Sequence, residues 1–114
     1  MPHSKQKLLA DIQIAIEQIR EITRNSARAN YEKDTTVRLA VERLLINIGE
    51  AVSQLVRAYP ETADRITECN RIINLRHRLI HGYSDVSNAV IWDIVQTKLD
   101  RLFEEAQYIL TDRQ

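Results

Sequence analysis

The residues best suited to chemistry lie between Asn70 and His81, a stretch with three arginines, two histidines and no acidic residue. The guanidinium of Arg76 stays charged, and its forked geometry matches a phosphate group. We expect His81 at the end of a helix and partly exposed, where an imidazole titrates near neutrality and can accept or donate a proton. The stretch therefore indicates local contact with phosphate combined with proton transfer.

The helical wheel of this stretch gives Arg76 an unusual place, in the middle of an apolar arc. That arc consists of Ile66, Cys69, Ile72, Ile73, Leu75, Leu79 and Ile80, and the opposite, polar line consists of Asn70, Asn74, His77 and His81. Because an unpaired buried guanidinium is costly, Arg76 either pairs with a carboxylate of another helix, such as Glu50, or lies at a seam between subunits and meets phosphate there.

The same wheel separates Arg76 and His81 by about 140°. Either the last helical turn unwinds near Gly82, or the two residues converge across a dimer. His81 can also be read as an ordinary surface histidine. His77 and His81 have the i, i+4 spacing of a metal-binding pair, but their face carries no Asp or Glu as a third ligand. We therefore expect no metal and no cofactor.

The elements that must position these residues are long helices, because the chain has only two glycines and two prolines. Apolar residues at helical spacing predict helices from about residue 4 to the late twenties, 36–58, 60–82 and from 87 onward. Pro60 suits a first helical turn, Gly82 a left-handed end and Ser87 an N-cap. The stretch 25–36 reads as a frayed end or a loop. We expect an all-α, antiparallel four-helix bundle, with or without a short extra helix, as a single domain over residues 1–114.

The overall charge gives little indication of nucleic-acid binding, because sixteen basic residues balance sixteen acidic ones. Cys69 is the only cysteine and cannot form an internal disulfide. The first residues lack the apolar core of a signal peptide, and no apolar run is long enough for a membrane span. These observations predict a cytoplasmic protein without a membrane partner.

A known motif emerges from the same residues. Arg76, four residues, then His81, Gly82 and Tyr83 resemble the R-x-x-x-x-H-x-Y motif of HEPN proteins, and specifically of the HepT toxin group. His77 supplies the polar residue that these proteins usually carry after the arginine. The segment Ile46-Asn47-Ile48-Gly49-Glu50-Ala51 is also similar to theirs, as is the length of the chain. The resemblance covers essentially the whole sequence.

This resemblance implies a metal-independent endoribonuclease that works as a homodimer. In such a dimer Arg76 and His81 of two subunits would meet in one cleft. One His81 would deprotonate a ribose 2′-OH, the other would protonate the leaving 5′-oxygen, and Arg76 would stabilise the charged intermediate, leaving a 2′,3′-cyclic phosphate. His77 would orient the phosphate or hydrogen-bond to His81. Arg78 would hold flanking RNA, and Asn74 is a weaker candidate for the cleft.

The resemblance also implies a role for Tyr83. HepT toxins are paired with a small antitoxin, a nucleotidyltransferase of the MNT type, which transfers AMP to the motif tyrosine. This chain would then be the toxin of a type VII-like toxin–antitoxin pair. A simpler interpretation makes Tyr83 a ring that covers the helix end. Two other functions stay open: a non-catalytic helical partner or substrate-positioning subunit of a nucleotidyltransferase, and a plain structural bundle. Cleavage of RNA in EDTA separates the nuclease from both.

Overall fold

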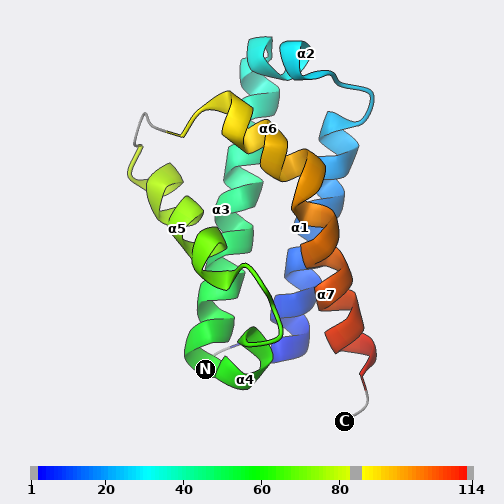
Figure 1. Ribbon diagram of the computed structural model, residues 1–114, viewed down its shortest axis with the longest axis vertical. Helices are drawn as coiled ribbons and strands as arrows, with labels where there is room; N and C mark the ends of the chain where they lie inside the picture. Colours follow the sequence, from blue (N-terminus) through cyan, green and yellow to red (C-terminus); the bar gives the residue numbers. More distant parts are fainter. Residues whose placement is uncertain (1–2, 83–85, 113–114) are drawn as a thin grey trace.

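The prediction of an all-α bundle is confirmed. The computed structural model describes residues 3–82 and 86–112, and within these ranges all regular structure is helical (Figure 1). The helices of the described residues are α1 (Lys5–Thr23), α2 (Arg28–Lys33), α3 (Thr35–Ala58), α4 (Pro60–Ala63), α5 (Cys69–Ile80), α6 (Asn88–Thr97) and α7 (Leu99–Thr111). None of these helices combines the length and the apolar character that a membrane crossing requires.

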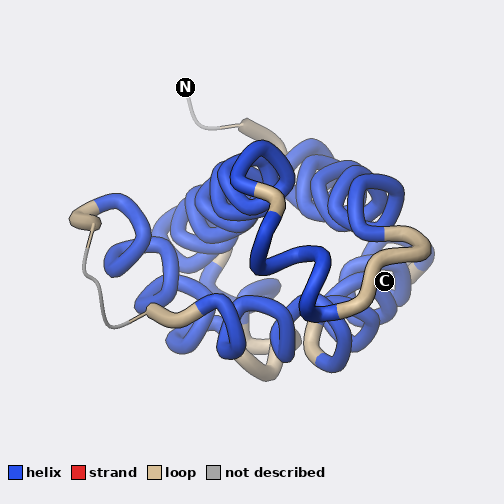
Figure 2. Tube along the Cα trace, turned by 90° about the horizontal axis from the view of Figure 1, so that it is seen from above, coloured by secondary structure: helices blue, strands red, loops and turns tan. Residues whose placement is uncertain are grey.

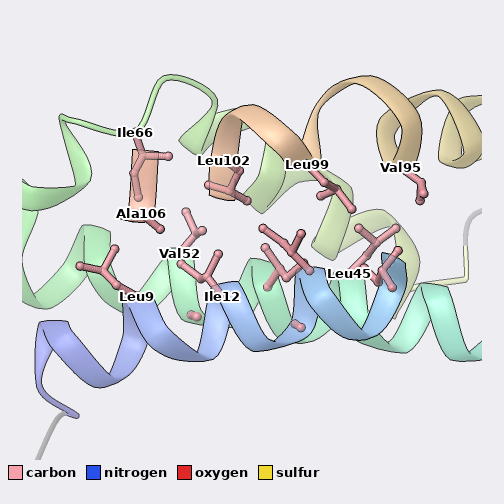
Figure 3. Packing of buried hydrophobic residues seen from close by; sticks show 14 of the residues in the cluster. Leu9, Ile12, Leu45, Val52, Ile66, Val95, Leu99, Leu102 and Ala106 are labelled. Carbon is pink, nitrogen blue, oxygen red and sulfur yellow. The ribbon is translucent and has the colours of Figure 1, made fainter. Parts of the chain in front are cut away.

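The core lies between α1, α3 and α7, which run side by side along the long axis of the molecule (Figure 1). Each helix contributes the apolar stripe that its sequence predicts, because residues three and four apart share one face. Figure 3 shows Leu9 and Ile12 of α1 facing Val52 of α3 and Leu102 of α7. The buried residues of these stripes and of the stripe of α6 include Leu8, Ile12, Ala15, Ile19, Val41, Ile48, Val52, Leu55, Ile91, Val95, Leu99, Leu102 and Ala106.

Helix α3 is the central element of the bundle. Its first turn is capped by Asp34, whose carboxylate accepts a hydrogen bond from the N–H of Val37 at 3.1 Å. It ends at Ala58 because Tyr59 precedes a proline and leaves the helical region, with φ −137° and ψ 63°. Helices α1 and α5 both pack against α3, as the end-on view in Figure 2 also shows. Helix α3 therefore packs against neighbours on two of its faces.

The expected continuous helix over residues 60–82 is wrong, because the chain turns between α4 and α5. Tertiary contacts explain the break. Ile66 is buried against the core, next to Ala106 of α7 in Figure 3. The hydroxyl of Thr67 donates a hydrogen bond to the Glu105 carboxylate at 2.5 Å. A straight helix would have kept Ile66 on the arc of Cys69 and away from α7, so packing against α7 outweighs the local helical pattern.

The polar stretch 25–36 was expected to be frayed or a loop, yet it contains α2. Its anchor is Tyr31, which is buried with 1% of its surface exposed and packs on Trp92 of α6 with ring centroids 5.2 Å apart. Burial, followed by the nearby Glu42 carboxylate, raises the pKa of Tyr31 to about 12, although Arg38 acts in the opposite direction. A single aromatic side chain thus turns a polar segment into part of the fold.

The last predicted helix is divided into α6 and α7 at Lys98. Its start is as expected, since the Ser87 hydroxyl accepts a hydrogen bond from the N–H of Val90 at 3.2 Å. The change of direction at Lys98 lets α6 cross toward α2 while α7 runs along α1 (Figure 1). One helix could not make both contacts.

Candidate active site

The helix that carries the predicted site, α5, lies on the outer side of α3 and buries none of its residues completely. Figure 2 shows it at the edge of the molecule. Its last turns contain the basic residues Arg76, His77 and Arg78, followed by His81. Cationic side chains are favourable there, because the partial negative charge of a helix lies at its C-terminal end. The predicted site is therefore on a surface helix that packs against α3 with one of its sides.

The support comes from a close approach between α5 and α3 at Gly49. A Cβ atom at this position would lie 2.4 Å from the Cβ and 3.0 Å from the Cδ of Arg76. No side chain other than hydrogen fits this space without a shift of the helices. The aliphatic stem of Arg76 consequently lies directly on the α3 backbone, and its place along α3 is determined by packing.

The guanidinium of Arg76 forms an ion pair with Glu50, 2.7 Å from Nη2 to Oε2. Of the two interpretations of Arg76, pairing with a carboxylate of another helix is thus observed within one chain. Glu50 also accepts a hydrogen bond from the Gln54 amide at 3.2 Å and lies 3.9 Å from Arg57. The side chains of Arg76 and Glu50 are 30% and 40% exposed, so an anion from solvent can reach the pair.

The two histidines of α5 are in contact on another side of the helix. Their rings lie 4.3 Å apart between centroids and are tilted by 55°. The helix does not unwind before His81, whose N–H donates a hydrogen bond to the His77 carbonyl at 3.1 Å. Gly82 then has a φ of +67°, so the predicted left-handed end is confirmed. Unwinding therefore does not bring His81 toward Arg76 in this chain.

Asn74 and Arg78 lie next to the histidines around the circumference of α5. Both line a cavity of about 440 Å³ between α3, α5, α6 and α7, whereas Arg76, His77 and His81 are not among the described residues that line it. The structure thus distributes the predicted residues around α5. Arg76 packs against α3, the two histidines face outward, and Asn74 and Arg78 face the cavity. Tyr83 lies outside the described residues.

The sequence interpretation missed two features of this region. Gly49 was noted only within the segment that resembles the HepT group, although a glycine inside a 24-residue helix already signals a close backbone approach. Basic residues at the junction of α6 and α7, Lys98 and Arg101, were also missed, because nothing local relates them to α5.

The Cys69 thiol, at the start of α5, lies in a packed environment. Burial raises the pKa of the Cys69 thiol, with Glu105 and Asp64 adding to the effect, and its Sγ lies 3.3 Å from the Ala63 carbonyl oxygen. Among residues 3–82 and 86–112, no group of three or more His, Cys, Asp or Glu side chains is arranged to hold a metal ion.

Comparison with known proteins identifies the family. The family model for HepT-like ribonucleases matches residues 12–109, a range that contains α3, α5 and the whole R-x-x-x-x-H-x-Y segment. The chain belongs to the HepT-like ribonuclease family. The HEPN-type resemblance of the motif is thereby confirmed.

Curated relatives of this HepT-like chain span nearly its full length. A protein of Methanocaldococcus jannaschii, provisionally named an RNase, is 32% identical over 108 residues, which cover 91% of this chain and 85% of the relative. A protein of Thermococcus cleftensis named as a probable ribonuclease HepT is 33% identical over 106 residues, covering 90% and 92%. The comparison with solved structures gave no significant match.

Proposed function

We propose that this protein is a metal-independent endoribonuclease, the toxin of a toxin–antitoxin pair, with Arg76 and His81 as its catalytic residues. The observation that carries the proposal is the way in which the stem and the guanidinium of Arg76 are held. Its stem packs on Gly49, while its charged end pairs, among the described residues, with the Glu50 carboxylate, whose side chain is 40% exposed. A guanidinium held in this way is preorganised for a phosphate that replaces Glu50.

The reaction requires one base and one acid. A neutral His81 takes the proton of a ribose 2′-OH, and the alkoxide attacks the adjacent phosphorus. Arg76 stabilises the negative charge of the phosphorane, and a protonated His81 supplies the proton to the leaving 5′-oxygen. The P–O5′ bond breaks, leaving a 2′,3′-cyclic phosphate and a 5′-hydroxyl. His77, in ring contact with His81, orients its imidazole.

The second His81 comes from a second copy of the chain. Within one chain Arg76 and His81 occupy different sides of a regular helix, so one copy does not bring them together. The apolar side chain of Ile80, between them on the helix circumference, is 47% exposed. A twofold homodimer would cover this side chain and place Arg76 of one subunit opposite His81 of the other.

The proposed antitoxin is a nucleotidyltransferase that transfers AMP to Tyr83. This residue follows the Gly82 turn directly, next to the basic end of α5. A phosphate attached there would compete with RNA for Arg76 and Arg78 and add bulk beside His81.

One observation favours a second candidate function, a non-catalytic helical partner or substrate-positioning subunit of a nucleotidyltransferase. The Arg76–Glu50 ion pair is complete within one chain. The ion pair therefore gives Arg76 a structural role that does not involve binding RNA.

Cleavage of RNA by the purified protein in EDTA separates the two functions. We expect products with 2′,3′-cyclic phosphate ends. Arg76→Ala and His81→Ala should each abolish cleavage while circular dichroism shows an unchanged helical content. Arg28→Ala and His3→Ala are matched controls at exposed positions and should cleave normally. Full activity of His81→Ala would contradict the catalytic assignment, and an inactive wild type would favour the non-catalytic partner.

Modification is tested by co-expression with a nucleotidyltransferase encoded beside the toxin. Intact mass and peptide mapping should show AMP on Tyr83. Tyr83→Phe should stay toxic and escape neutralisation, whereas Tyr108→Phe, a change at a tyrosine that is 69% exposed on α7, should be neutralised like wild type. If the antitoxin silences Tyr83→Phe as well, it acts by binding alone.

A further inference from the structure

The cavity beside α5 is large enough for a small ligand. Its volume is about 440 Å³, within the range of about 300–1,000 Å³ that is usual for ligand pockets. Apolar side chains of α3, α5 and α6 contribute to its lining, among them Ile48, Ile72, Leu75 and Ile94. Such a surface accepts a flat, weakly polar group by burial of apolar area.

Basic side chains stand around this apolar surface. Arg71 and Arg78 come from α5, and Lys98 and Arg101 come from the junction of α6 and α7. Arg71 and Arg101 have acidic neighbours, Glu68 at 3.5 Å and Glu105 at 3.9 Å, but the two arginine side chains are 76% and 60% exposed. The Glu68 and Glu105 side chains are 28% and 20% exposed and also line the cavity, so a ligand phosphate has to bind at the exposed, outer ends of the two arginines. Lys98 forms no ion pair with the described residues.

Hydrogen-bonding groups complete the lining. Asn74 of α5 and Asp93 and Thr97 of α6 add amide, carboxylate and hydroxyl groups. All three side chains are exposed, and the Thr97 hydroxyl already donates a hydrogen bond to the Asp93 carbonyl oxygen at 2.7 Å. Among the described residues, four basic ones and three acidic ones, Glu68, Asp93 and Glu105, line the cavity beside its apolar surface, and this combination fits a heteroaromatic ring that carries a phosphate.

The cavity is next to the histidines along α5. Asn74 and His81 are seven residues apart, so they differ by only about 20° around a helix with 3.6 residues per turn. Arg78 directly follows His77 in sequence and lines the cavity. A polynucleotide strand that passes His81 therefore has the cavity as its nearest recess on this side of the helix.

We infer that this cavity binds one nucleotide of the RNA strand, adjacent to the phosphate that is cleaved. The base lies against Ile72, Leu75 and Ile94, and its phosphate lies among Arg78, Lys98 and Arg101. The inference rests on the proposed ribonuclease function and adds a subsite to it. Single-stranded RNA suits such a site, because its unstacked bases are free to enter a pocket.

The test uses His81→Ala protein, so that no cleavage interferes. The probes are the four ribonucleoside 5′-monophosphates and inorganic phosphate, and the readout is methyl NMR with affinities from titration. We expect at least one nucleotide to shift the methyl signals of Ile72 and Ile94 and to bind about tenfold more tightly than inorganic phosphate. Shifts centred on Ile14, which lines a second cavity between α1 and α3, would overturn the inference. Equal binding of inorganic phosphate would do so as well.

Two substitutions locate the ligand. Val90 lines the cavity and is 49% exposed, so Val90→Trp fills the space with little disturbance of the core. We expect nucleotide affinity to fall about tenfold. Val56→Trp is the matched control, because Val56 is 40% exposed on α3 and is not among the residues that line the cavity. Equal affinity of the Val90→Trp and Val56→Trp proteins would overturn the inference.

A second pair of variants serves if Val90→Trp does not fold. Lys98→Ala should weaken nucleotide binding about threefold, because it removes one exposed cation from the rim. Lys33→Ala on α2 is the control and should bind like the parent protein. If the Lys98→Ala and Lys33→Ala proteins bind nucleotides with equal affinity, the proposed position of the phosphate is wrong.

Cleavage assays distinguish failure of the subsite from failure of the nuclease. If wild type cleaves RNA and Val90→Trp, made in wild-type background, cleaves with unchanged kcat and KM, the subsite is wrong and the nuclease stands. If nucleotides bind in the cavity and wild type does not cleave, the nuclease is wrong, and the cavity is a nucleotide-binding site that is not part of a cleavage site.

Discussion

Gly49 of α3 and Arg76 of α5 are in direct contact, so close that a Cβ atom on Gly49 would lie 2.4 Å from the Cβ of Arg76. The two helices cross at the one point where α3 has no side chain. The next residue of α3, Glu50, then lies within 2.7 Å of the Arg76 guanidinium. Packing thus determines where Arg76 lies, and the carboxylate determines where its charged end points.

The first prediction concerns Gly49→Ala. A glycine-to-alanine change inside a helix ordinarily stabilises a protein by about 0.5–1 kcal/mol. Here the new methyl group overlaps Arg76, and overpacking costs about 1–3 kcal/mol. We expect a net loss of stability in urea unfolding, together with loss of RNA cleavage, because Arg76 must move.

The chain's other glycine provides the comparison for this variant. A Cβ at Gly82 would meet no atom within 4 Å, and its φ is +67°. Gly82→Ala should therefore lose about 1 kcal/mol through backbone strain alone. Glu50→Gln should also lower the free energy of unfolding less in the Gly49→Ala protein than in wild type. In the Gly49→Ala protein the ion pair between Glu50 and Arg76 is already displaced. A Gly49→Ala protein more stable than wild type would show that α3 and α5 are not held this closely.

The second prediction concerns Glu50→Gln. In the proposed mechanism the Glu50 carboxylate and the RNA phosphate compete for Arg76, and the substituted amide can still accept a hydrogen bond from it. We expect KM for RNA to fall about threefold at low salt, with kcat little changed. Loss of stability should stay below about 1 kcal/mol because the pair is partly exposed.

Glu104→Gln on α7 changes the total charge by the same amount and is the control. It should leave KM close to that of wild type. If Glu50→Gln loses activity while its KM is unchanged, Glu50 holds Arg76 for catalysis rather than competing with RNA.

The third prediction concerns mixed dimers of Arg76→Ala and His81→Ala chains. Each variant alone should be inactive. The mixed dimer keeps one Arg76 and one His81 on different chains, and these face one another if the site is formed across the interface. Because one His81 remains to serve as base or as acid, but not both, we expect it to regain only a small part of the wild-type cleavage, measured after purification through two different affinity tags. A mixed dimer as inactive as its parents, or a strictly monomeric wild type in light scattering, would contradict a shared site.

The fourth prediction concerns Tyr31 and alkaline pH. The pKa of Tyr31 is about 12 in the folded chain, above its ordinary value of 10. The unfolded chain therefore releases this proton first as pH rises, so stability is fully present below pH 10 and is lost between pH 10 and 12. The loss is on the order of 2 kcal/mol.

Tyr31→Phe should remove this loss. The Tyr31 hydroxyl is buried and has no hydrogen-bond partner among the described residues, so the substitution should leave stability at pH 7 equal or higher. Urea unfolding at pH 7, 10 and 11.5 measures both effects, with Tyr108→Phe as the exposed control. A stability decline in Tyr31→Phe as steep as that of wild type would show that Tyr31 does not cause it.

Local residue patterns alone were sufficient for much of the architecture. Helix-spaced apolar residues predict α1, α3 and the helical character of α6 and α7, though not the division between these two, because a helix repeats its faces within its own segment. Ser87 and Gly82 mark helix ends through hydrogen bonding and backbone freedom that depend on neighbouring residues only. The basic end of α5 is likewise visible in a short run of sequence. Each of these features is encoded within a few helical turns.

Contacts between distant segments decided the rest. The choice of Glu50 as the partner of Arg76, and the role of Gly49 beneath it, depend on where α5 crosses α3. The break between α4 and α5 depends on Glu105, 38 residues beyond Thr67 in the chain. Lys98 approaches the cavity wall of α5 only after α6 and α7 have packed on α2 and α1. Sequence periodicity specifies which face of a helix is buried, but only the packed structure specifies what that face meets.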